Sequence, residues 1–129
     1  MCTPRARDAM KLLGYLFMQQ GMPERAATLY SALVAHEPDQ PEHLRALALA
    51  LSRAGRHEQV LDALDRLALP GAVDLRFHLL RAQTLSVLER TDEAAVAMRA
   101  YLDIMAHEAA LSNPGADWRR QPETETPPR

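Results

Sequence analysis

The feature that most constrains the fold of this 129-residue chain is a repetition with a period of 34 residues. Four positions of the period keep their character through the chain: small residues at Gly14, Ala48 and Ala82, small or β-branched residues at Ala26, Val60 and Ala94, large residues at Tyr30, Leu64 and Met98, and a turn position at Gly21, Gly55 and Glu89. One shared spacing can arise by chance. Four columns with the same spacing indicate three copies of one structural unit.

Each column has a physical role in a helical hairpin. The small residues of the first two columns allow the two helices of a unit to approach closely. The large residues lie four positions further along the same face of the second helix and fill the space behind that contact. Gly21 and Gly55 end the first helices, because glycine readily takes the left-handed conformation that closes a helix. Glu89 takes it at a higher cost, so we expect a less regular third turn.

A helical hairpin repeated every 34 residues is the unit of the tetratricopeptide-type (TPR) fold. The chain is therefore predicted to be all-α, a three-repeat TPR-like α-solenoid of six antiparallel helices. An Ala- and Leu-rich composition with only 5% aromatic residues favours helix over strand. The repeats are expected at about 7–40, 41–74 and 75–108, and the helices at 5–20, 23–36, 41–54, 57–68, 73–88 and 91–109.

Three segments fit the repeat less simply. The stretch LRALALAL at 44–51 alternates like a strand, but it lacks β-branched residues and is predicted to be helical. The break at 67–73 is two residues shorter than the ideal ending of a second repeat, so we expect an unusual angle between the second and third repeats. Residues 112–129 are proline-rich and almost devoid of apolar side chains, so we expect a disordered tail after a repeat domain at 1–111. Whether Trp118 docks onto that domain is left open.

Charge and composition exclude several classes of function. The net charge of -2 is too close to zero for a nucleic-acid-binding surface. No apolar stretch is long enough to cross a bilayer, and the N-terminus does not resemble a secretory signal. We therefore expect a cytoplasmic protein that neither inserts into membranes nor binds nucleic acid. Cys2, the single cysteine, can form no internal disulfide and is interpreted as an incidental thiol.

The sequence contains none of the patterns that we would expect of a catalytic or metal site. Its histidines form no HExxH pair and have no cysteine partners; they are His36, His43, His57, His78 and His107. A glycine-rich phosphate loop and a GxSxG motif are also missing. We therefore predict a protein that is not an enzyme and needs no cofactor or metal.

The concave wall of such a solenoid is lined by the first helix of each repeat. In the standard repeat, five positions of that helix project into the groove. They correspond here to Asp8, Lys11, Tyr15, Met18 and Gln19, then Glu42, Arg45, Leu49, Ser52 and Arg53, then Arg76, Leu79, Gln83, Ser86 and Val87. The predicted groove has an apolar centre of Tyr15, Met18, Leu49, Leu79 and Val87, surrounded by Lys11, Arg45, Arg53 and Arg76. The alternative is that these apolar residues only pack between helices.

These residue types predict how the groove would bind. Burying one large apolar side chain contributes about 1.5–3 kcal/mol, whereas an exposed ion pair contributes about 0–1 kcal/mol. Affinity would therefore come from the apolar centre, and the basic residues would favour acidic partner residues. The expected ligand is an amphipathic helix or an extended segment of another protein.

Two segments, LLGYLFMQQGMPERAATLYSALVAHEP at 12–38 and LLRAQTLSVLERTDEAAVAMRAYLD at 79–103, resemble small TPR chaperones of bacterial type III secretion systems. The greatest similarity is to the YscY (SctY) group, through its LxxG(W/Y)L-like start at Leu12–Leu16 and its RAQ…L…A…YL ending at 81–102. The resemblance covers about residues 9–105; the proline-rich tail departs from the group's compact ending. It implies a cytosolic chaperone that binds the small secreted protein YscX (SctX) and engages the export gate with it.

The last helix is expected to carry apolar residues that no following element covers, namely Ala95, Met98, Tyr101, Leu102 and Met105. A partner, a second copy or the tail would cover them. We therefore expect an obligate heterodimer that is oligomeric or poorly soluble without its partner. The alternatives are a general TPR scaffold, such as a pilus-assembly module, and a secretion chaperone of the translocator or needle-subunit type.

Overall fold

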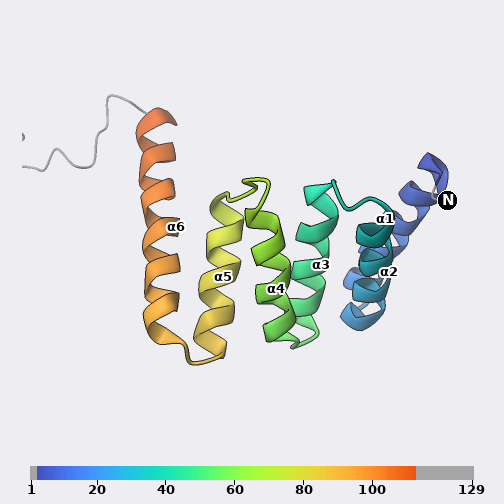
Figure 1. The fold of residues 1–129 in the computed structure, drawn as a ribbon, viewed down its shortest axis with the longest axis horizontal. Helices are drawn as coiled ribbons and strands as arrows, with labels where there is room; N and C mark the ends of the chain where they lie inside the picture. Colours follow the sequence, from blue (N-terminus) through green and yellow to red (C-terminus); the bar gives the residue numbers. More distant parts are fainter. Residues whose placement is uncertain (1–2, 113–129) are drawn as a thin grey trace, which may run out of the picture.

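The computed structural model describes residues 3–112, and all regular secondary structure in this range is helical. The helices are α1 (Pro4–Gln19), α2 (Pro23–His36), α3 (Pro41–Arg53), α4 (His57–Ala68), α5 (Leu75–Val87) and α6 (Thr91–Ser112). They stand side by side and alternate in direction, with α1 and α2 at one end of the array and α6 at the other (Figure 1). The predicted all-α, three-repeat solenoid is confirmed, including a helix over residues 44–51.

The helices begin with residues that suit a first turn. Pro4, Pro23 and Pro41 occupy the first helical position, where no backbone N–H is needed for the intrahelical ladder. At α5, Asp74 is the N-cap, and its Oδ1 accepts a hydrogen bond of 3.0 Å from the backbone N–H of Phe77. The sequence predicted that this helix begins at residue 73, one residue before the cap. This boundary was wrong by two residues, because α5 begins at Leu75, directly after the cap.

The turns inside the three hairpins share one geometry. Gly21, Gly55 and Glu89 all have positive φ, at 73°, 78° and 60°. After α5, the N–H of Arg90 bonds to the carbonyl of Leu85 at 2.9 Å, and the turn after α3 has the equivalent bond, from Arg56 to Leu51, at the same length. The expectation of a less regular third turn is therefore wrong. The hydrogen bonds of the turn hold Glu89 in the left-handed region despite the steric cost of its Cβ.

Close helix packing within each hairpin depends on the small residues of the repeat. Gly14 is buried, and a Cβ added to it would lie 2.7 Å from Cζ of Tyr30, so the Tyr30 ring would have to shift to admit any larger residue. Ala48 and Ala82, the matching residues of the later repeats, are 0% and 1% exposed. The reciprocal residues on the second helices, Ala26, Val60 and Ala94, are also buried. The predicted register of the three hairpins is thus confirmed.

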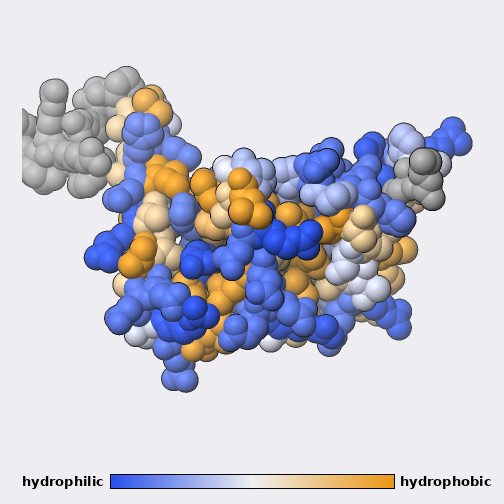
Figure 2. Space-filling view, viewed as in Figure 1, coloured by the Kyte–Doolittle hydropathy of each residue, from blue (hydrophilic) through white to orange (hydrophobic). Residues whose placement is uncertain are grey.

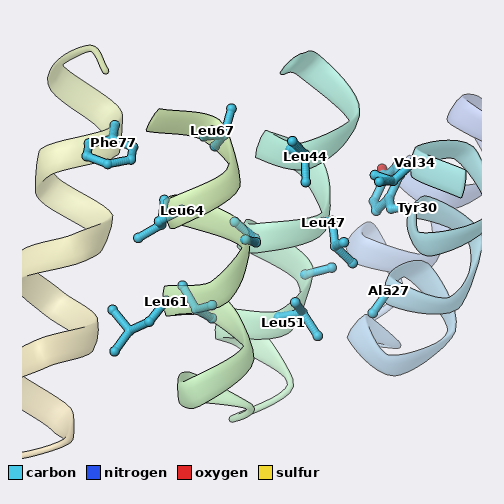
Figure 3. Packing of buried hydrophobic residues seen from close by; sticks show 14 of the residues in the cluster. Ala27, Tyr30, Val34, Leu44, Leu47, Leu51, Leu61, Leu64, Leu67 and Phe77 are labelled. Atoms are coloured by element: carbon cyan, nitrogen blue, oxygen red, sulfur yellow. The ribbon is translucent and has the colours of Figure 1, made fainter. Parts of the chain in front are cut away.

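The core runs along the middle of the array (Figure 3). Leu44, Leu47 and Leu51 lie on the side of α3 that faces α2, opposite the buried residues Tyr30 and Val34. On α4, Leu64 and Leu67 are almost completely buried, at 1% exposed each, while Phe77 of α5 is buried beside them. In the third repeat, Met98 was expected to fill the same space as Tyr30 and Leu64, but it is 38% exposed because no helix follows α6 in the described part of the chain.

The junction between the second and third repeats is the loosest of the array. Helix α4 contacts α5 much less extensively than α2 contacts α3, whereas α5 packs most extensively on α6. The connection from Leu69 to Asp74 contains Gly71 at a φ of 84°, and the side chain of Leu69 is largely exposed. The unusual angle expected between these repeats after the short break 67–73 stays a prediction.

Candidate partner-binding groove

A pocket of about 390 Å³ opens at this loose junction, between α3, α4 and α5. We call it the α3–α5 pocket. Helix α3 and helix α5 supply its two walls, and α4 supplies residues between them. Its lining consists of Arg45, Ala46, Ala48, Leu49, Leu64, Leu67, Asp74, Arg76, Phe77, Leu79, Leu80 and Gln83.

The apolar lining divides into a rigid floor and an accessible wall. Ala48, Leu64 and Leu67 are at most 1% exposed, so they form a floor that belongs to the core. Leu49 on α3 is 44% exposed, and Leu79 on α5 is half-buried. These two side chains therefore offer apolar surface that a further side chain would remove from water.

The polar residues of the pocket lie on α3, on α5 and at the start of α5. Arg45 Nη2 lies 3.2 Å from Asp74 Oδ2, and both side chains are nearly half exposed. Asp74 also caps α5, so its position is fixed by the backbone of that helix. Arg76 forms no ion pair with any residue in the described range 3–112. The pocket therefore combines apolar surface with a net positive charge at its edge.

The structure brings together five of the eleven residues predicted for the groove. Arg45, Leu49, Arg76, Leu79 and Gln83 all line the α3–α5 pocket. That these residues contact a partner stays a prediction.

The other six predicted groove residues lie outside the pocket, and so do Asp8, Glu42, Ser52 and Ser86. Lys11 Nζ donates to Glu42 Oε1 at 3.3 Å, which links α1 to α3. Met18 packs against the core and is half-buried. The remaining four are exposed, namely Tyr15, Gln19, Arg53 and Val87. Tyr15 and Val87 do not line the α3–α5 pocket with Leu49 and Leu79, and their contact with a partner stays a prediction.

Sequence reasoning missed several residues of the pocket. Leu64 was assigned to the core, and its edge also reaches the pocket floor. Leu80 and Phe77 lie on the flank of α5 and follow no groove position of the standard repeat. Asp74 could have been recognised from the sequence as a helix N-cap, because aspartate is a preferred residue just before a helix. Its pairing with Arg45 depends on the tertiary fold.

The first junction, in contrast, is closed by a charged network. The ring Nε2 of His43, which is 1% exposed, lies 2.8 Å from Glu37 Oε1, and Arg7 Nη1 donates to Glu37 Oε2 at 3.4 Å. The hydrogen bond to His43, followed by the charge of Arg7, lowers the pKa of Glu37. The three residues thus link α1, the α2–α3 connection and α3 by directional contacts.

Histidines were not expected to bind metal, and the described residues contain no group of three or more metal-ligating side chains. Within the same range, none of the helices has both the length and the apolar character that a membrane span requires. Cys2, Trp118 and the predicted tail from residue 113 lie outside the described residues, while Ser112 is the last residue of α6.

A comparison with protein families agrees with the geometry. A family model described as a tetratricopeptide repeat matches residues 5–84, which is more than half of the chain. The chain belongs to the tetratricopeptide repeat family. Tetratricopeptide repeats typically serve as protein-binding scaffolds rather than as catalysts, so a role in protein interaction is supported at this coarse level. No curated protein matches the sequence significantly.

Proposed function

We propose that this TPR protein is a partner-dedicated chaperone of a type III secretion system. Its α3–α5 pocket would bind and stabilise a small secreted protein of the YscX (SctX) kind. The observation that carries the proposal is the open apolar pocket at the loose junction, with arginines at its edge and a partly exposed leucine on its wall.

The pocket has the dimensions and chemistry of an anchor site for a protein segment. A volume of about 390 Å³ is large enough for one or two large apolar side chains, and lies near the lower end of the range of ligand pockets. Each such side chain would contribute about 1.5–3 kcal/mol by leaving water. An amphipathic helix laid between α3 and α5 would place residues one turn apart over Leu49 and Leu79.

The charges favour acidic residues beside the anchor. Arg76 has no competing carboxylate in the described range, so a partner aspartate or glutamate would pair with it without breaking a contact. Arg45 is held by Asp74 and would exchange that exposed ion pair for another at small net cost. The arginines would then set orientation and partner preference, while the apolar contact supplies most of the affinity.

The narrower parts of the proposal come from the resemblance of residues 12–38 and 79–103 to the YscY (SctY) group. These narrower parts are three: the chain forms an obligate heterodimer with the secreted partner, it is located in the cytoplasm, and the complex engages the export gate. The tetratricopeptide match alone favours a second candidate, a general protein-interaction scaffold without a dedicated secreted partner. Secretion-apparatus genes beside the coding gene would favour the chaperone over this scaffold.

The test is co-expression of the full chain with a SctX-type protein encoded nearby. We expect the two to co-purify as a complex, and Leu49→Glu to abolish the complex while helical circular dichroism is retained, because the glutamate would place a charge on the pocket wall. Leu69→Glu is the matched control, since Leu69 is 87% exposed and lies outside the pocket. Normal binding by Leu49→Glu would contradict the assignment of the pocket.

A further inference from the structure

Helix α6 ends the array with one flank that nothing in the described chain covers. In Figure 2, apolar surface is visible along α6 between hydrophilic side chains. The residues of this flank are all exposed, with Met98, Leu102 and Met105 at 38%, 52% and 43%; Ala95 and Ala109 extend the flank at either end. The inner face of α6 packs on α5 through Ala94 and Ala97.

The spacing of these residues is that of a coiled-coil seam. Ala95, Met98, Leu102, Met105 and Ala109 follow one another at alternating steps of three and four residues. This alternation keeps the side chains on one stripe and is the pattern of helices that pair lengthwise. The stripe extends over about 21 Å of helix at 1.5 Å per residue. We call it the α6 seam.

The α6 seam is symmetric in side-chain size about Leu102. Met98 and Met105 flank Leu102, and Ala95 and Ala109 lie beyond the methionines. An antiparallel partner with the same sequence would therefore place Leu102 against Leu102 and Ala95 against Ala109, and would bring Met98 within one residue of the level of Met105. Small ends allow the helices to approach closely there, and the flexible methionines fill the space next to the centre. We propose that a second copy of this chain covers the α6 seam, as a two-fold antiparallel α6 pair.

Charges beside the seam support this occupant and orientation. Arg99 and Asp103 are both exposed, follow each other on one side of the helix, and form no ion pair within residues 3–112. Antiparallel pairing brings Arg99 of each copy toward Asp103 of the other, twice by symmetry. In a parallel pair, Arg99 would instead lie level with Arg99 of the other copy, and Asp103 level with Asp103.

The two ends of the array offer a second contact between copies, which would make a different assembly. Helix α1 at the opposite end of the array exposes Leu12, Leu13 and Leu16. Pairing α6 of one copy with α1 of the next would be heterologous, so it would grow into open chains rather than close as a dimer. The α6 seam has the internal symmetry that closure requires. It shares no residue with the α3–α5 pocket, so the inference is independent of the proposed function.

The experiment is sedimentation equilibrium of the full chain without a partner, over a wide range of concentrations. We expect a monomer–dimer equilibrium that ends at twice the chain mass of 14.4 kDa. Leu102→Glu should raise the dissociation constant more than about 100-fold, because two seam centres are lost and two charges oppose each other. Leu111→Glu is the control, since Leu111 is 68% exposed, lies two and a half turns after Leu102 and therefore on the opposite face of α6, and should leave the dimer unchanged. Circular dichroism of both variants verifies folding.

Charge reversal tests the orientation. Arg99→Asp or Asp103→Arg alone should weaken the dimer about five- to thirtyfold, and the two changes in one chain should restore it. A monomer at all concentrations would overturn the proposal, and so would a dimer that survives Leu102→Glu. A mass that rises without limit and is reduced by Leu12→Glu would overturn it in favour of the heterologous contact with α1.

Discussion

The junction between the first and second repeats differs from the one between the second and third, although both join hairpins of the same register. At the first junction, apolar residues of α2 and α3 interdigitate, and the contacts of Glu37 with Arg7 and His43 close the connection. At the second, α4 contacts α5 sparsely, and the α3–α5 pocket opens. The difference teaches that a repeat protein opens a pocket where one interface between repeats is filled less completely than its equivalent.

The largest effect on stability should follow from disturbing the close packing of α1 on α2. Ala26 is fully buried at the crossing of α1 and α2. Ala26→Arg should destabilise the first repeat by about 4 kcal/mol or more, because the core would receive an unpaired charge and excess volume. Thermal and denaturant unfolding followed by circular dichroism would measure this as a lowered unfolding midpoint and a loss of total helix. Ala35→Arg, at an exposed position of α2, should remain folded; equal stability of both variants would refute the close-approach model.

An intermediate effect is expected when the large residue at the equivalent position of the second and third repeats is truncated. Leu64→Ala should cost about 2–5 kcal/mol, because Leu64 is 1% exposed and its loss leaves a cavity. Met98→Ala should cost less than about 1 kcal/mol, because Met98 is 38% exposed. Urea unfolding, at a concentration where the chain is monomeric, gives both values. Equal costs would mean that the third repeat is packed as fully as the second.

The smallest effect concerns the turns. Glu89→Gly should stabilise the chain by about 0.5–1 kcal/mol, because glycine takes a φ of 60° without the steric cost of a Cβ. Gly55→Ala should destabilise it by about 1 kcal/mol through backbone strain alone, since nothing lies within 4 Å of the added Cβ. Shifts of the urea midpoint report both changes. No gain from Glu89→Gly would indicate that the glutamate side chain compensates for its strain.

Much of the fold was predictable because it depends on local chemistry that repeats. The small residues and turn positions that recur every 34 residues located the hairpins, and five of the six expected helix starts agree within one residue. The third turn was misjudged, since the hydrogen bonds that hold Glu89 outweigh its conformational preference. Helix α6 also runs three residues beyond its expected end, to Ser112.

The pocket was only partly predictable for a related reason. Standard repeat positions identified Arg45, Leu49 and Leu79, which share the walls of one pocket. They also included Tyr15 and Val87, because a residue pattern does not reveal how far successive hairpins separate. That distance depends on how the side chains of neighbouring hairpins pack in three dimensions. It decides which exposed side chains meet.

The central claim, that a polypeptide partner binds at the looser junction, is tested most directly by amide hydrogen exchange. The full chain would be compared alone and in complex with the SctX-type protein. The account predicts new protection in α3 and α5 around the α3–α5 pocket, with little change in α2. Protection confined to α1 and α2, with exchange in α3 and α5 unaltered, would contradict it.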